Sequence, residues 1–186
     1  FYALKKAFPN GIFPSDIGCY TLGMNMESVD TCHDMGAAIT FASGLYQAYH
    51  QDGKDIPIIA TIGDSTFYHS GAPGLLNAVY NGARFVLVIL DNSITAMTGM
   101  QPTPESGVTA DDHPGKALSI EDLVKGCGVK YLKVINPYDM KNMIREVRNG
   151  NIHVVLLDDE IEGVKACDLV GIFKKISPRI QVIVIS

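Results

Sequence analysis

The chain is short of charged residues and has no excess of positive charge. Charged residues make up 19% of its 186 residues, and the formal net charge is −5. General nucleic-acid binding needs a basic surface, so this class of function is not expected. A phosphorylated cofactor remains compatible with the composition, because a metal ion and backbone N–H groups can bind phosphate without many basic side chains.

The sequence also lacks close cysteine pairs and long apolar runs. Its cysteines form no C-x-x-C pair, so neither a zinc ribbon nor an iron–sulfur motif is expected. A chain that is 47% hydrophobic can form a core without disulfides, and we expect a reducing cytoplasm. No stretch is long and apolar enough for a membrane span or a signal peptide. The chain starts without Met, and we expect it to be part of a longer protein.

Short apolar runs alternate with segments of helical pattern. Continuous β-branched runs are typical of buried parallel strands, so the sequence predicts an α/β fold, with a mostly parallel sheet and helices on both faces. Ser119 and Asp122 form a near capping box at the start of one predicted helix. The long polar segment 98–117 is predicted to be a functional loop. The predicted strands are 57–62, 85–90, 129–134, 152–157 and 181–185, and the predicted helices are 35–50, 72–82, 119–126 and 138–149. The glycines of 63–74 predict a Gly-rich turn before the helix at 72–82.

Polar residues follow two neighbouring predicted strands directly. Gly63 and Asp64 come after 57–62, and Asn92 closely follows 85–90. Because the carboxyl ends of parallel strands share one edge of the sheet, Asp64 and Asn92 are expected there together. Their oxygens, with a backbone carbonyl such as that of Ile94, would suit Mg²⁺, which shares its oxygen shell with phosphates and water. Gly-Asp and Asp-Asn are also common turn formers, and on these residues alone that alternative stays open.

The surrounding strings resemble a known family. GDSTFYHSGAPGLLNAVYNGA, LVILDNSITAMTGMQPTP, FPSDIGCYTLG and VDTCHDMGAA are similar to the thiamine-diphosphate-binding domain of indolepyruvate ferredoxin oxidoreductase alpha subunits. The resemblance covers residues 1–150. It implies that Asp64 and Asn92 are side-chain ligands of Mg²⁺ and that Ile94 is a carbonyl ligand. It further implies a set of cofactor-binding residues at or near the diphosphate and the cofactor rings: Gly18, Cys19, Gly63, Asp64, Ser65, Thr66, Asn92, Thr95 and Thr98.

The resemblance also implies an activity and a set of partners. The family oxidatively decarboxylates 2-oxoacids such as indolepyruvate to acyl-CoA, with thiamine diphosphate, coenzyme A and ferredoxin. Its activating Glu comes from a separate pyrimidine-binding domain and its iron–sulfur clusters from a ferredoxin-like module. Neither is recognisable here, so we predict an incomplete half-site without an identifiable catalytic residue. It would work in an oligomer with a pyrimidine-binding domain or subunit and a beta subunit.

Two other interpretations concern the substrate and the cofactor. The first is a member of the same cofactor class that acts on pyruvate or a branched 2-oxoacid, since the aromatic preference comes only from the resemblance. The second is a Rossmann dinucleotide-binding domain, which is disfavoured because no G-x-G-x-x-G follows a strand. His33 and Asp34 depart from the expected family pattern and leave the aminopyrimidine side less defined.

Residues 151–186 have a different character. They resemble the middle of a response-regulator receiver domain, with Asp158 at the phospho-acceptor position and Ser186 at the switch position. The early acidic pair and the late Lys of that family are missing, so phosphorylation of Asp158 is not expected. Two interpretations of these residues stay open. The first is a nonenzymatic signalling module, and the second, which is favoured, is a β-α-β unit that extends the sheet.

Overall fold

The structure is a computed structural model, and its described residues fall into two compact units. One unit comprises Gly11–Met24 and Val29–Leu132, and the other comprises Phe1–Asn10, Asn25–Ser28 and Lys133–Ser186. The first is called the sheet unit below, and it contains all the predicted cofactor and metal residues. The residues that the structure describes are 1, 4–5, 8–132, 134, 154–158, 160–161, 164–165 and 181–185.

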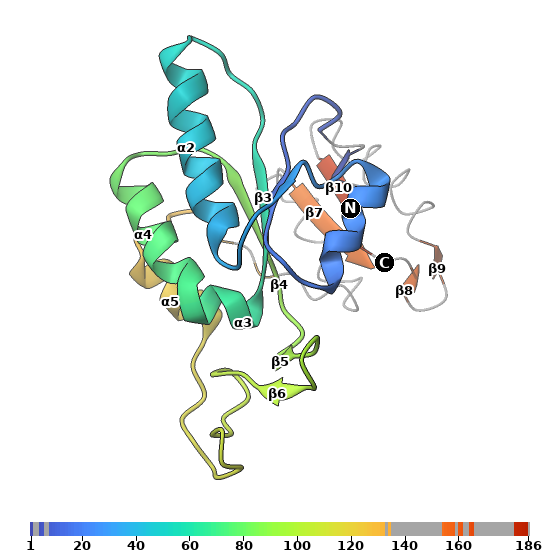
Figure 1. The fold of residues 1–186 in the computed structure, drawn as a ribbon, viewed down its shortest axis with the longest axis vertical. Coiled ribbons are helices and arrows are strands. Elements are labelled where there is room, and N and C mark those ends of the chain that lie inside the picture. Colours follow the sequence, from blue (N-terminus) through green and yellow to red (C-terminus); the bar gives the residue numbers. More distant parts are fainter. Residues whose placement is uncertain are drawn as a thin grey trace. The chain divides into compact units, whose positions relative to one another are not determined.

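A four-stranded parallel sheet forms the centre of the sheet unit (Figure 1). Its order is β2-β1-β3-β4, so the chain crosses over between neighbouring strands, as expected of an α/β fold. All three pairings in this sheet are parallel. The bounds of the strands are Pro14–Ser15 for β1, Thr31–Cys32 for β2, Ile59–Gly63 for β3 and Val86–Leu90 for β4.

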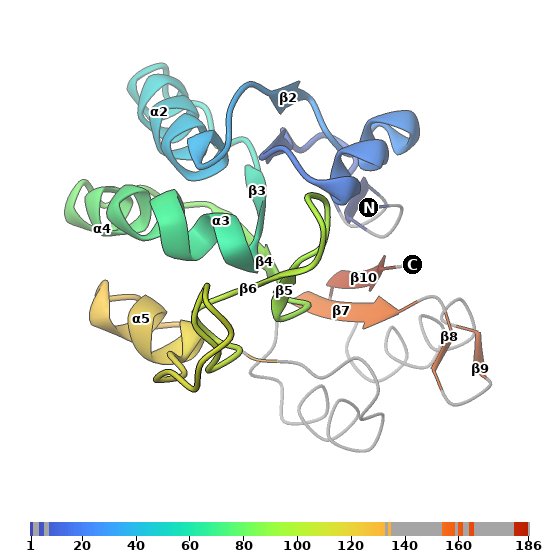
Figure 2. The same cartoon turned by 60° about the horizontal axis from the view of Figure 1, so that its bottom comes forward.

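Three helices pack side by side on one face of β3 and β4: α2 (Ala37–Gln51), α4 (Ala72–Tyr80) and α5 (Ile120–Gly126) (Figures 1 and 2). Alternate residues of the β3 segment, Ile58, Ala60 and Ile62, are buried against them because side chains alternate along a strand. The core beneath these helices is formed by Ile39, Phe67, Leu75, Ala78, Ile120, Val124 and Cys127, and by the small residues Ala38 and Ala42.

A buried carboxylate ties α2 to the sheet. Asp16, which follows β1, is fully buried, and its two carboxylate oxygens accept the backbone N–H groups of Gly36 and Ala38, each at 2.6 Å. These groups belong to the start of α2, whose first N–H groups have no partner within the helix. Asp16 therefore caps α2 from a distant part of the sequence, although burial raises the pKa of its carboxyl group.

Most predicted elements of the sheet unit are confirmed. Two strands, the long α2 and the cap of α5 lie where they were predicted, and the hydroxyl of Ser119 accepts the N–H of Asp122 at 3.1 Å. The short strands β1 and β2, the 3₁₀ helix η1 (Cys19–Met26) and the hairpin of β5 (Ile94–Thr95) and β6 (Gln101–Pro102) were not predicted. The mostly parallel α/β class is confirmed, and the predicted helix 138–149 lies outside the described residues.

Two predictions were wrong. The predicted strand 129–134 is irregular where it is described, because Gly128 turns the chain after α5 at a φ of 91° and Tyr131 is left exposed. The predicted Gly-rich turn before α4 is helical instead. It consists of α3 (Asp64–Thr66) and the π-helical segment η2 (Phe67–Gly71), which run directly into α4. A side chain at Gly71 would come within 2.9 Å of Ile62 and Phe67, so this glycine permits close packing on β3.

The second unit contains a parallel pair of strands. β7 (Val154–Asp158) pairs with β10 (Gln181–Ile185) in parallel, which is the strand arrangement of a β-α-β unit. An antiparallel pair that was not predicted, β8 (Glu160–Ile161) and β9 (Val164–Lys165), follows β7. Asp158 is the last residue of β7, whereas Ser186 lies outside the described residues. In the described part of the chain, no helix has the length and apolarity needed to span a membrane.

Candidate functional site

The candidate site lies at the carboxyl edge of the parallel sheet. β3 ends at Gly63 and β4 ends at Leu90, so Asp64 and Asp91 leave the sheet at the same edge. The register pairs Gly63 with Leu90, which places the residues that follow the two strands next to each other. Ligands of open α/β sheets bind at this edge because the loops there diverge and expose polar groups.

Asp64 is the central polar residue of this edge. It opens the helical stretch and is only 3% exposed, and its Oδ2 has no hydrogen-bond partner. Burial raises the pKa of Asp64, and the charge of Asp91 raises it further, whereas the backbone N–H groups of Ser65, Asp64 itself and Ile94 lower it. A buried carboxylate oxygen without a partner is costly, and a bound cation would remove that cost.

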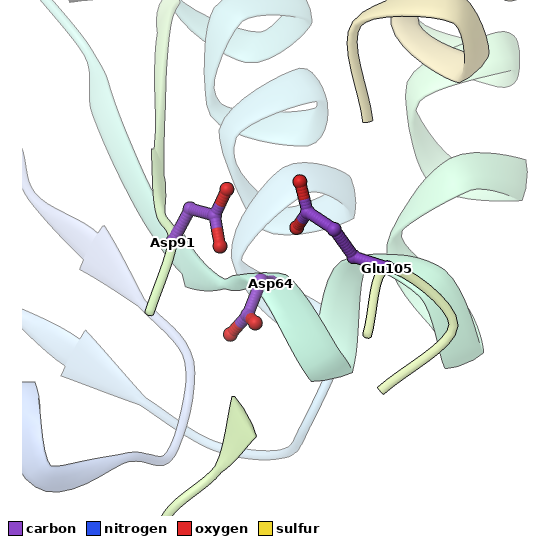
Figure 3. Close-up of side chains that lie close together, drawn as sticks. All are labelled: Asp64, Asp91 and Glu105. Carbon is purple, nitrogen blue, oxygen red and sulfur yellow. The ribbon is translucent and has the colours of Figure 1, made fainter. Parts of the chain in front are cut away.

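Three carboxylates converge around this position. Asp64, Asp91 and Glu105 each offer one oxygen, and these oxygens lie within 4.8 Å of one another. In Figure 3, Asp91 and Glu105 reach toward each other above the start of α3. Burial, followed by the charge of Asp91 and a hydrogen bond with it, raises the pKa of Glu105 to about 7. The cluster therefore binds a proton near neutral pH when no cation balances its charge.

The turn after β4 brings further oxygen atoms to the same edge. The Asn92 amide oxygen accepts the N–H of Ile94 at 3.2 Å, and Asp91 accepts the N–H of Ser93 at 2.8 Å. Ser93 has a φ of 57°, the left-handed conformation that such a tight turn requires. The turn therefore places Asn92 and Ile94 beside the carboxylates. The backbone N–H of Ile94 also makes a hydrogen bond to Asp64.

A hydroxyl pair links the start of the helix to the hairpin. Thr95 Oγ1 donates to Ser65 Oγ at 2.8 Å, so the predicted diphosphate residues Ser65 and Thr95 are in contact. Thr66 is buried and Thr98 lies exposed at the tip of the hairpin, where its hydroxyl donates to Gln101 at 2.6 Å. The structure thus brings Ser65 and Thr95 together and leaves Thr98 engaged with its own hairpin.

Residues 16–21, a loop that continues into the first turn of η1, reach the same strand end. Tyr20 in this segment accepts the N–H of Gly63 at 3.0 Å through its hydroxyl. The predicted ring-side residues of this loop differ in exposure, since Gly18 is half-buried and Cys19 is exposed with a free thiol. Burial raises the pKa of Tyr20 to about 12, with added contributions from the nearby negative groups of Asp16 and Asp64, so its hydroxyl stays protonated.

Several residues of this edge were not predicted. Asp91 precedes Asn92 at the end of a predicted strand, and this position could have identified it. Glu105 carried no such signal, because it lies in the long polar segment 98–117, whose path only the folded chain reveals. Tyr20 lies in the FPSDIGCYTLG string, and its role depends on a hydrogen bond to Gly63 that the sequence does not show.

The oxygen ligands at this edge fit a hard divalent cation. Carboxylate, amide and backbone carbonyl oxygens are the ligands that Mg²⁺ prefers, and the unpartnered Asp64 oxygen offers an open position.

Comparisons with known proteins identify the family of this chain. The family model "Thiamine pyrophosphate enzyme, C-terminal TPP binding domain" matches residues 16–159. The chain is 50% identical over 158 residues to the indolepyruvate oxidoreductase subunit IorA of Archaeoglobus fulgidus, covering 82% of this chain and 25% of that protein. It is 44% identical over 176 residues to the subunit of the same name from Thermococcus kodakarensis, covering 88% of this chain and 26% of that protein.

A solved structure resembles the fold. Benzoylformate decarboxylase from Polynucleobacter necessarius superimposes with a TM-score of 0.50 at 16% sequence identity, covering 98% of this chain and 31% of that one. The resemblance inferred from the sequence strings is confirmed, and the chain spans about a quarter of the length of the curated relatives. The chain belongs to the thiamine pyrophosphate enzymes, and it carries their C-terminal TPP binding domain.

Proposed function

We propose that this domain binds thiamine diphosphate through a Mg²⁺ ion held by Asp64, Asn92 and the Ile94 carbonyl. The observation that carries the proposal is the buried Asp64 oxygen without a partner, which lies beside other oxygen ligands at the carboxyl edge of the sheet. Asp64 opens a helical stretch whose first N–H groups can also face an anion. The hydroxyls of Ser65 and Thr95, which already contact each other, would complete the phosphate contacts.

Charge balance supports a metal-dependent mode of binding. The segment 63–74 contains no Lys or Arg, and the next basic residue is Arg84, beyond α4. The diphosphate would meet three carboxylates at this edge rather than a basic pocket. A divalent cation between the carboxylates and the phosphates is therefore required to neutralise both.

The whole protein would be a 2-oxoacid:ferredoxin oxidoreductase of the indolepyruvate type, located in the cytoplasm. Thiamine diphosphate supplies the carbanion chemistry that decarboxylates 2-oxoacids. This domain's own residues hold the diphosphate end and fix its orientation. A pyrimidine-binding domain or subunit would supply the activating Glu, and other parts of the assembly would supply the iron–sulfur clusters, ferredoxin contact and coenzyme A site. Aryl 2-oxoacids are the proposed substrates because the relatives are named for indolepyruvate.

Calorimetry on the purified chain tests the proposal. Thiamine diphosphate should bind in the presence of Mg²⁺, lose its binding in excess chelator and regain it with Mn²⁺. Thiamine without phosphates should bind poorly, because the metal and N–H contacts are made to the diphosphate. Asp64→Ala should abolish binding while far-UV circular dichroism stays unchanged.

Asp55→Ala is the matched control, since Asp55 is an exposed carboxylate in the loop before β3. It should bind like the wild type. Equal affinity for thiamine and its diphosphate, or indifference to chelator, would show that Asp64 and Asn92 only end strands.

A further inference from the structure

Tyr20 connects two segments that meet at the carboxyl edge of the sheet. Its hydroxyl accepts the Gly63 N–H at 3.0 Å and makes a longer contact of 3.4 Å to the Ile17 carbonyl in its own loop. The loop is closed on itself, because the N–H of Gly18 donates to Thr21 Oγ1 and the N–H of Thr21 donates to the Gly18 carbonyl. Tyr20 therefore joins an internally hydrogen-bonded turn to the residue that immediately precedes Asp64.

The Tyr20 hydroxyl accepts a hydrogen bond that a neighbouring strand would otherwise accept. β1 pairs with β3 only through Ser15 and Thr61, and the Asp16 N–H donates to the Thr61 carbonyl. Gly63 lies two residues beyond Thr61, so its N–H points to the same side, where β1 has already ended. A backbone N–H at the end of a buried strand needs an acceptor, and Tyr20 provides it.

The neighbouring glycines leave room for the Tyr20 ring. A Cβ at Gly18 would stand 2.2 Å from a ring carbon of Tyr20, and one at Gly63 would stand 3.3 Å away. The first distance is impossible without moving the ring, and the second is tight. The glycine at position 18 is therefore explained by the Tyr20 ring, independently of any cofactor contact.

We propose that Tyr20 is a positioning residue of the cofactor site, which fixes the Gly63 peptide and thereby the direction in which Asp64 leaves the sheet. This inference rests on the proposed function. Tyr20 also holds the loop that carries Cys19 against the strand end. It acts through Gly63 and Asp64 and does not coordinate the metal itself.

Tyr20→Phe tests this role because it removes only the hydroxyl and keeps the ring. Mn²⁺ with thiamine diphosphate is the probe, followed by electron paramagnetic resonance well below the melting temperature of every variant. We expect affinity for the Mn²⁺–thiamine diphosphate pair to fall about tenfold, the size of one lost hydrogen bond. The line shape of the bound Mn²⁺ should also change, because the Asp64 oxygens move relative to the other ligands.

Two further variants separate positioning from general stability. Val124→Ala truncates a buried core residue of α5, so it should lower the melting temperature while leaving affinity and line shape unchanged. Gly18→Ala displaces the ring without removing it, and it should reproduce the Tyr20→Phe defect. In the double variant, the loss of affinity should be smaller than the sum of the two single losses, because both substitutions act on one contact.

The outcomes distinguish this inference from the function on which it rests. If the wild-type chain does not bind the Mn²⁺–thiamine diphosphate pair, the proposed function fails and the role of Tyr20 fails with it. If the wild type binds and Tyr20→Phe binds equally well with the same line shape, only the positioning role is overturned. A Val124→Ala defect as large as that of Tyr20→Phe would also overturn it, since loss of stability would then explain both.

Discussion

Proton binding at Glu105 should make the metal affinity of this edge depend on pH. The pKa of Glu105 is raised to about 7 by burial and by Asp91, so a cation that enters the cluster must displace this proton. At about pH 6 the protonated form outnumbers the ionised form roughly tenfold, and at about pH 8 the ratio is reversed. The affinity for a divalent cation should therefore rise about tenfold between these two pH values.

The direction of this effect follows from which state binds the proton. A raised carboxyl pKa means that the metal-free folded chain holds a proton that the metal-bound chain releases, so metal binding strengthens as pH rises. Mn²⁺ alone is the appropriate probe, since the phosphates of thiamine diphosphate titrate in the same range. Glu105→Gln removes the titrating group and should give an affinity that changes much less from pH 6 to pH 8.

Titration of Mn²⁺ at several pH values, by electron paramagnetic resonance, provides the measurement. Asp111→Asn is a suitable control, because Asp111 is an exposed carboxylate on the same long polar segment. It should retain the wild-type pH dependence. A flat wild-type profile, or the same slope in Glu105→Gln, would refute the assignment of the proton to Glu105.

Three further predictions concern stability and completeness of the site. Asp16→Ala should lower the free energy of unfolding by about 3 kcal/mol in urea titrations, because two N–H groups of α2 lose their acceptor; a loss below about 1 kcal/mol would contradict the cap. Ser119→Ala should cost about 1 kcal/mol through loss of the α5 cap, and Ser119→Asp should retain most of it. The chain alone should show no anaerobic indolepyruvate oxidation with coenzyme A and a viologen, and turnover would refute the half-site prediction.

The α/β class and the polar edge could be predicted from local sequence. β3 and β4 are continuous apolar runs, and such runs become buried parallel strands wherever helices cover them. Gly63 ends β3, Asp64 follows it, and Asn92 is the second residue after β4, so their common edge is a consequence of parallel pairing. The α5 cap could also be predicted from local sequence, because Ser119 and Asp122 are only three residues apart.

Other local patterns misled the prediction. The apolar segment 129–134 lacks a neighbouring strand in the described residues, and part of it packs as irregular chain against the helices. The glycines of 63–74 suggested a turn, yet Gly71 serves the close approach of a helix to β3. β1 and β2 have two residues each, too few for a periodic pattern. They form through pairing, because β1 pairs with β3 and β2 pairs with β1.

The sequence by itself therefore determined the strand ends at which Asp64 and Asn92 emerge, because each strand and its flanking residues are adjacent in the chain. Only the tertiary structure decided which distant groups meet them. Tyr20 bonds to Gly63, Asp16 caps α2, and Glu105 joins Asp64 and Asp91 across segments that are far apart in sequence. These contacts depend on chain paths through loops, where hydrogen bonding and packing, rather than any repeating pattern of residues, set the geometry.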